Sequence, residues 1–171
     1  MSVASQSGSA LLSRAAVIAT AMMFGLSYSL SAALIALDLA GQGHSETLIG
    51  ANVAMHAVGV LLTAMILPKI VARLGLRRLV ILALLLAAAV LVAFPALPFL
   101  WLWFLLRVLL GASSEVLFVL SETWTNSLST EETRARWMAT YTAALSVGFA
   151  LGPIILSLVG LRGSRLTLLA R

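Results

Sequence analysis

The stretch FLWLWFLLRVLLGASSEVLFVLS, residues 99–121, decides the fold of this chain. It is apolar except for a few small polar residues and the two charges of Arg107 and Glu115. At 1.5 Å per residue, a helix of this length crosses the ~30 Å apolar layer of a bilayer. The stretch therefore predicts a membrane-spanning helix.

The two charges make this helix costly to insert. Its Leu, Ile, Phe and Val side chains contribute roughly −4 to −8 kcal/mol, whereas Arg107 and Glu115 together cost roughly 5 to 7 kcal/mol. The two charges are about 12 Å apart along the axis, too far to pair directly. We therefore predict that Arg107, Glu115 and Glu122, which shares a face with Glu115, lie on a substrate or proton pathway. A structural ion pair is the alternative for Arg107.

The composition of the whole chain agrees with a membrane protein. Of its 171 residues, 61% are hydrophobic and 10% charged, against about 45–50% and about 25% in soluble domains. A soluble enzyme, a secreted disulfide domain and a disordered tail are thereby excluded. The absence of cysteine excludes disulfides and thiolate metal sites. The net charge of +5 would suggest nucleic acid in a soluble protein, but here the bilayer and its anionic lipids are the expected partner.

The apolar segments predict an all-α membrane protein with a transmembrane domain over residues 15–161. Residues 1–14 are predicted to be a disordered arm and residues 162–171 a basic tail. A cleaved signal peptide is the alternative for the first span. Pro68 is expected to open a loop, and Pro95 and Pro98 a turn. The predicted spans are about 15–37, 48–67, 79–95, 99–121 and 137–161.

Start signals and charges predict how the helices are oriented. Ser129 and Glu132 form a capping-box pattern, so the fifth helix should start near Thr130. Loops 68–78 and 127–136 carry Lys and Arg, whereas the polar loop 38–47 carries none. The basic loops, and with them the N-terminus, are expected on the cytoplasmic side of a bacterial inner (plasma) membrane. The arginines of the tail would then lie outside, against this rule.

Polar residues also mark single faces of other spans. Asn52, His56, Gly59 and Thr63 are spaced by 4, 3 and 4 residues, which places them on one helix face. Such a face serves either interhelical hydrogen bonding or a polar substrate or proton. Tyr28, in the polar part of the first span, joins Asn52 and His56 as a predicted pathway residue. The third span, Leu79 to Phe94, has no polar side chain and is expected to face lipid.

Glycines and a proline interrupt the fifth span. Gly148 and Gly152 are one helical turn apart and run directly into Pro153. The glycines allow another backbone to approach closely, and the proline bends a helix. The pattern predicts a bend at a moving contact.

Three motifs, in order, resemble the N-terminal half of the major facilitator superfamily of secondary transporters. The fourth span has the Arg-x-x-x-Gly of Arg107 and Gly111, and the fifth has the Gly-x-x-x-Gly-Pro just described. The loop from Pro68 resembles the family's loop signature, with Pro68 in place of Gly and Ala72 in place of Asp. The loop residues that fit are Arg73, Gly75, Arg77 and Arg78. The sequence from Glu122 to Asn126, Glu-Thr-Trp-Thr-Asn, resembles a branch of efflux and small-solute permeases.

The resemblance covers about residues 15–160 and implies a half-domain of two three-helix repeats, here without its last helix, with a site near the bilayer midplane. It implies a small solute and protons as partners, and the basic loop as a cytoplasmic latch. No cofactor, metal or catalytic residue is predicted. Because the family normally has about twelve spans, we expect a truncated permease that is inactive alone and either lacks its C-terminal half or self-associates.

Two other functions compete with transport. An intramembrane enzyme could use Ser113 or Ser114 as nucleophile and His56 as base. A small non-transporting membrane subunit or assembly factor would suit the short length.

Overall fold

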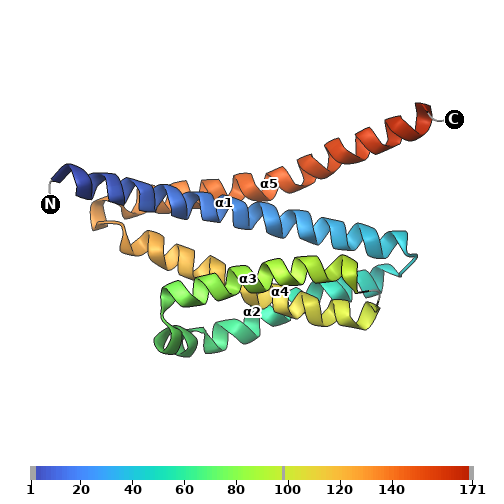
Figure 1. The fold of residues 1–171 in the computed structure, drawn as a ribbon, viewed down its shortest axis with the longest axis horizontal. Helices are drawn as coiled ribbons and strands as arrows, with labels where there is room; N and C mark the ends of the chain where they lie inside the picture. The colour runs from blue at the N-terminus through green and yellow to red at the C-terminus, as the bar shows by residue number, and fades with distance from the viewer. Residues whose placement is uncertain (1–2, 98, 170–171) are drawn as a thin grey trace. The chain divides into compact units, whose positions relative to one another are not determined.

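The computed structural model describes residues 3–97 and 99–169, and the side chains of residues 12–97 and 99–158. The elements within these ranges are helices (Figure 1): α1 (Val3–Gly41), α2 (Glu46–Leu74), α3 (Leu76–Ala96), α4 (Leu100–Ser127) and α5 (Glu131–Leu169). Each contains a segment long and apolar enough to cross a membrane: Leu12–Gly41, Glu46–Leu74, Leu76–Ala96, Leu100–Ser127 and Glu131–Leu158. The predicted all-α membrane fold with five spans is confirmed.

The first and last helices are longer than the predicted spans. α1 begins at Val3, so the segment predicted as a disordered arm is helical from residue 3. α5 continues to Leu169, through most of the predicted tail. Neither extension contains proline, and alanine, leucine and arginine favour continued helix growth. Residues 1–2 and 170–171 lie outside the described residues.

Pro68 does not open a loop. It lies inside α2, which continues to Leu74. Proline lacks an N–H donor and its ring crowds the carbonyl four residues earlier, but membrane helices tolerate such residues. The helix ends instead at Gly75, whose φ is +77° and whose N–H donates to the carbonyl of Val71 over 2.9 Å. Most of the basic segment predicted as a loop at 68–78 is therefore helical.

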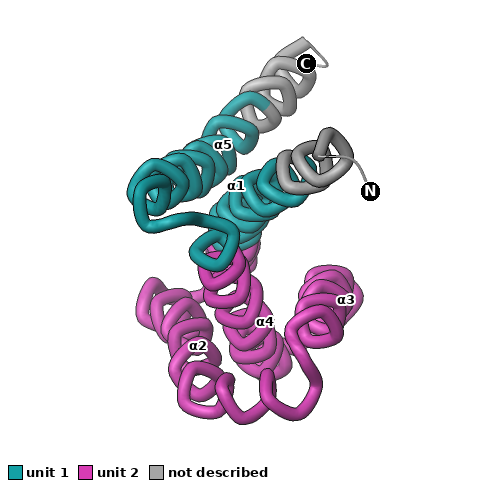
Figure 2. Tube along the Cα trace, turned by 90° about the vertical axis from the view of Figure 1, so that its left-hand side faces the viewer, with its two compact units in different colours: residues 1–34, 125–171 teal, residues 35–124 magenta. Residues whose placement is uncertain are grey.

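The chain forms two compact units (Figure 2). Unit 1 consists of residues 1–34 and 125–171, and unit 2 of residues 35–124. In unit 1, α1 lies beside α5. In unit 2, α4 lies between α2 and α3.

The core of unit 2 lies where α3 packs on α4. The rings of Phe94 and Trp103 meet edge to face, with centroids 5.4 Å apart. Trp103 also donates its indole N–H to the carbonyl of Leu97 over 2.9 Å, next to the end of α3. Buried around this pair are Ile35, Leu39, Val90, Leu106 and Leu110. The opposite side of α3 exposes Ile81, Leu82, Leu84, Leu85 and Val92, which agrees with a helix that faces lipid.

The fifth helix starts at Glu131, as predicted, but other residues cap it. The N–H of Thr130 donates to the Thr133 hydroxyl over 3.1 Å, and the N–H of Thr133 donates to the Thr130 carbonyl over 3.1 Å. The capping pair is therefore one residue later than the predicted Ser129 and Glu132. Ser129 instead donates its hydroxyl to the carbonyl of Thr125 over 2.8 Å.

Candidate functional site

The polar face of α2 is buried within unit 2. Asn52, His56, Gly59 and Thr63 are all buried, as the four-three-four spacing requires of residues on one face. Asn52 is 0% exposed. Polar groups that are buried this completely need hydrogen-bond partners, so the side chains of the neighbouring helix determine which hydrogen bonds they make.

Arg107 of α4 binds to this face. It is 2% exposed, and its Nε donates to Oδ1 of Asn52 over 3.1 Å. A hydrogen bond from a charged donor contributes roughly 1.5–3 kcal/mol, more than one between neutral groups. The acceptor is a neutral amide, so this contact is not the ion pair considered from the sequence. Asn52 Nδ2 is buried and makes no hydrogen bond within the described side chains.

Two glycines bring α2 and α4 close enough for this bond. A Cβ atom on Gly111 would collide with the backbone carbonyl of His56, and one on Gly59 with the carbonyl of Val108. The two backbones are therefore in direct contact. Gly111 is one turn after Arg107 in α4, and His56 is one turn after Asn52 in α2. One parallel alignment of α2 and α4 therefore produces both the Gly111–His56 backbone contact and the Arg107–Asn52 hydrogen bond.

The acidic residues of α4 are more accessible than Arg107. Glu115 and Glu122 are half-buried, and neighbours such as Val116 and Ser121 are buried. Ser113 donates its hydroxyl to the carbonyl of Leu110 in its own helix, over 2.9 Å. That hydroxyl proton is therefore not directed at His56, and the geometry does not support Ser113 as an enzyme nucleophile.

Tyr28, Gly148 and Gly152 lie in unit 1. The Tyr28 ring meets Phe149 of α5 edge to face, with centroids 5.5 Å apart. A Cβ atom on Gly148 would collide with the carbonyl of Met22, and one on Gly152 with the hydroxyl of Ser29. The structure therefore places both glycines at a close crossing of α1 and α5. Pro153 follows them inside α5 and is exposed.

The residues of the basic motif lie where α2 meets α3. Arg73, Gly75, Arg77 and Arg78 are all exposed. The positive φ of Gly75 favours glycine, because a side chain there would be strained. Because Gly75 alone links α2 to α3, the basic side chains lie at the end of α2 and the start of α3.

Two contacts were missed from the sequence. Asn52 was identified as a pathway residue and not as the acceptor for Arg107, although the amide on a predicted helix face was a usable signal. Arg14, a single basic residue just before the first predicted span, contacts Leu128 and Trp137. No sequence spacing could have found that contact, since its partners are more than a hundred residues away.

Comparison with known proteins gives two matches. The model of the Major Facilitator Superfamily matches residues 17–170. A curated protein of Bacillus subtilis (strain 168), described as the uncharacterized MFS-type transporter YfkF, is 29% identical over 140 residues. The match covers 82% of this chain and 36% of that relative, so the chain spans about a third of the relative's length. No solved structure matches the chain significantly.

Proposed function

The chain belongs to the Major Facilitator Superfamily, and from this membership we propose that it forms part of the solute pathway of a secondary transporter. The family resemblance expected from the motifs is thereby confirmed. The proposal depends on one observation in particular, the buried hydrogen bond between Arg107 and Asn52. A charged residue in a spanning helix costs roughly 2.5–3.5 kcal/mol and marks a functional site by default.

In this proposal the residues of unit 2 have different roles. Asn52 fixes the guanidinium of Arg107, which supplies a positive charge to the site. Glu115 is half-buried and two turns further along α4, so its carboxylate can meet water and bind a proton or a polar solute. Glu122 would exchange protons near the inner end, and His56 would contribute to the polar layer. The substrate is a small solute or drug, and proton coupling is part of the proposal.

We further propose that this 171-residue chain does not transport alone. Transport in this superfamily involves the rocking of two six-helix halves around a shared site. The chain has five spans within the described residues and matches 36% of its relative. A complete pathway would need the remaining helices or another copy of this chain. The proposed setting is a bacterial inner membrane with a cytoplasmic N-terminus.

Cysteine accessibility at Glu115 tests the pathway without a known substrate. The chain has no native cysteine, so Glu115→Cys gives one reactive thiol. Because thiols ionise only where water reaches them, we expect a charged methanethiosulfonate reagent to modify Glu115→Cys in membrane vesicles. Leu105→Cys is the matched control on α4, since Leu105 is 52% exposed on a surface expected to face lipid.

A second control reports orientation. Arg77→Cys, on the basic motif, should react in inside-out vesicles and not with reagent outside intact cells. Equal resistance of Glu115→Cys and Leu105→Cys in vesicles where Arg77→Cys reacts would contradict the pathway. Reaction of Arg77→Cys in intact cells would contradict the proposed orientation.

A further inference from the structure

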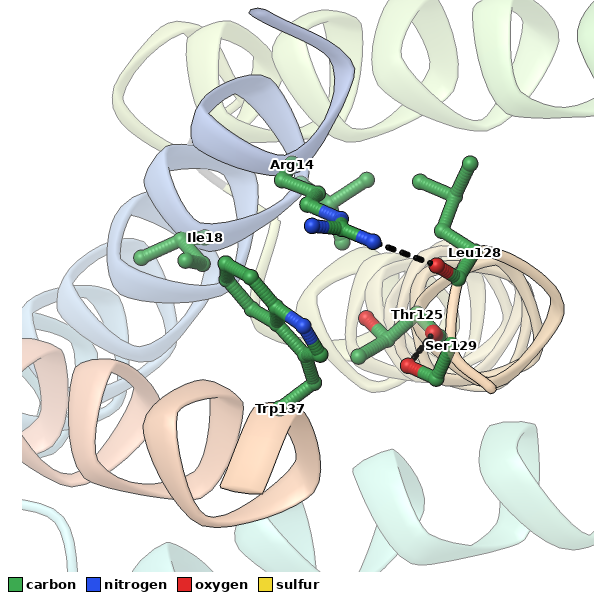
Figure 3. A pocket seen from close by; sticks show the side chains of 7 residues that line it. Arg14, Ile18, Thr125, Leu128, Ser129 and Trp137 are labelled. Atoms are coloured by element: carbon green, nitrogen blue, oxygen red, sulfur yellow. Dashed lines mark hydrogen bonds between the residues drawn. The ribbon is translucent and has the colours of Figure 1, made fainter. Parts of the chain in front are cut away.

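A cluster in unit 1, apart from the proposed pathway residues, joins α1 to the end of α4 and the start of α5 (Figure 3). Arg14 comes from α1, Leu128 and Ser129 from the connection between α4 and α5, and Trp137 from the beginning of α5. These side chains surround a small recess that Val17, Ile18 and Thr125 also line.

The guanidinium of Arg14 makes two different contacts. Its Nη2 donates to the carbonyl of Leu128 over 3.0 Å, just after the last residue of α4. Its Cζ lies 4.5 Å from the centroid of the Trp137 ring. The carbonyls at a helix end lack helical donors and carry the negative end of the helix dipole, so a cation is stabilised there. Tryptophan is the ring that binds a cation best.

The connection is folded in a way that presents the Leu128 carbonyl to Arg14. Ser129 donates its hydroxyl to the Thr125 carbonyl, and the N–H of Ser129 donates to the carbonyl of Asn126 over 3.2 Å. These two bonds tie Ser129 to the last turn of α4, and Figure 3 draws the bond from its hydroxyl. The Leu128 carbonyl is thus held in place, and the donor that reaches it comes from α1.

We propose that Arg14 is a positioning residue: α1 supplies it as a cap for the end of α4, and it clamps the α4–α5 connection and the start of α5 to α1. A planar guanidinium can donate in its plane and stack on an indole with its face, whereas an ammonium cannot do both equally well. Resting on the proposed function, the clamp makes α1, the end of α4 and the start of α5 move together within unit 1 during the transport cycle.

Val17 provides a local measure of whether the clamp is closed. It lines the recess and is 4% exposed, so a thiol at this position reacts only when the recess opens. We would measure the rate at which N-ethylmaleimide labels Val17→Cys in the purified chain. With Arg14→Gln added, labelling should accelerate on the order of tenfold, because a charged hydrogen bond and a cation–π contact are lost together. Arg14→Lys should give a smaller increase.

Two controls separate the clamp from general effects. Arg134→Gln removes the same charge from an exposed position on α5 and should leave labelling of Val17→Cys unchanged. Ala83→Cys, at a 4% exposed position of α3 in unit 2, reports general unfolding and should not respond to Arg14→Gln. Equal labelling of Val17→Cys with Arg14→Gln and with Arg134→Gln would overturn the proposal.

If Arg14→Gln does not accumulate, Arg14→Lys and Trp137→Leu test the same clamp. Each should accelerate labelling. Because both changes weaken the same contact between Arg14 and the Trp137 ring, the labelling rate of the double variant should rise by less than the product of the two single effects. If the effects of Arg14→Lys and Trp137→Leu on the labelling rate simply multiply, the proposed clamp would be overturned. None of these measurements involves Glu115, so failure of the clamp and failure of the proposed pathway remain distinguishable.

Discussion

Arg107 shows that a buried charge can donate a hydrogen bond to a neutral neighbour. Asn52→Leu removes the acceptor of its Nε while keeping a side chain of similar size. We expect the free energy of unfolding, measured by denaturant titration in detergent, to fall by about 1–3 kcal/mol. Thr63→Val is the matched control, because Thr63 is buried on the same face of α2 and makes no hydrogen bond within the described side chains. It should change the unfolding free energy little.

The Arg107–Asn52 pair also predicts that a second substitution can restore stability lost by the first. Asn52→Leu removes the acceptor of the Arg107 Nε and leaves that buried donor without this bond. Adding Arg107→Met removes the donor as well, so it should recover part of the stability. An effect of Asn52→Leu that is just as large in the Arg107→Met background would show that the two residues are not coupled, and would contradict this account.

At the scale of whole helices, glycines set the closest crossings in each unit. Gly111→Ala would place a methyl group against the carbonyl of His56, and backbone cannot move aside as a flexible side chain can. We expect the midpoint of thermal unfolding to fall, with a loss of about 1–3 kcal/mol. Gly148→Ala should behave alike, because its methyl group would meet the carbonyl of Met22.

Gly50→Ala is the control for helix propensity. Gly50 also lies in a helix, but apart from its chain neighbours and the adjacent backbone of α2, no atom lies within 4 Å of the position its Cβ would take. Alanine should therefore stabilise α2 by up to about 1 kcal/mol. If Gly111→Ala were as stable as Gly50→Ala, the close crossing of α2 and α4 would be wrong.

At the scale of the whole molecule, the chain is expected not to carry solute by itself. The purified chain would be placed in liposomes that contain a pH-sensitive dye, and small cationic, anionic and neutral solutes would be added across a proton gradient. We expect no solute-dependent change in internal pH beyond that of empty liposomes. A solute-dependent proton flux that disappears with Arg107→Leu would contradict the expectation and indicate transport by associated copies.

The elements of this protein were largely predictable, because lipid imposes a simple rule on each segment separately. Any segment that crosses the bilayer must be apolar and helical, so a run such as 99–121 is recognised from its own sequence, without knowledge of the helices that pack against it. Helix ends were less predictable. Pro68 was expected to open a loop, but the loss of its own N–H donor does not end α2, which continues to Leu74, and the positive φ of Gly75 ends the helix instead.

Residue patterns alone were enough to predict a membrane protein, five spans within the part of the chain that the structure describes, the polar face of α2, and the family. Tertiary structure alone decided the partners: Asn52 for Arg107, the backbone of His56 for Gly111, and Leu128 with Trp137 for Arg14. The reason is physical. Hydrophobicity and helical periodicity are properties of one segment, whereas a hydrogen bond or a close crossing depends on the relative register of two helices, which only their mutual packing fixes.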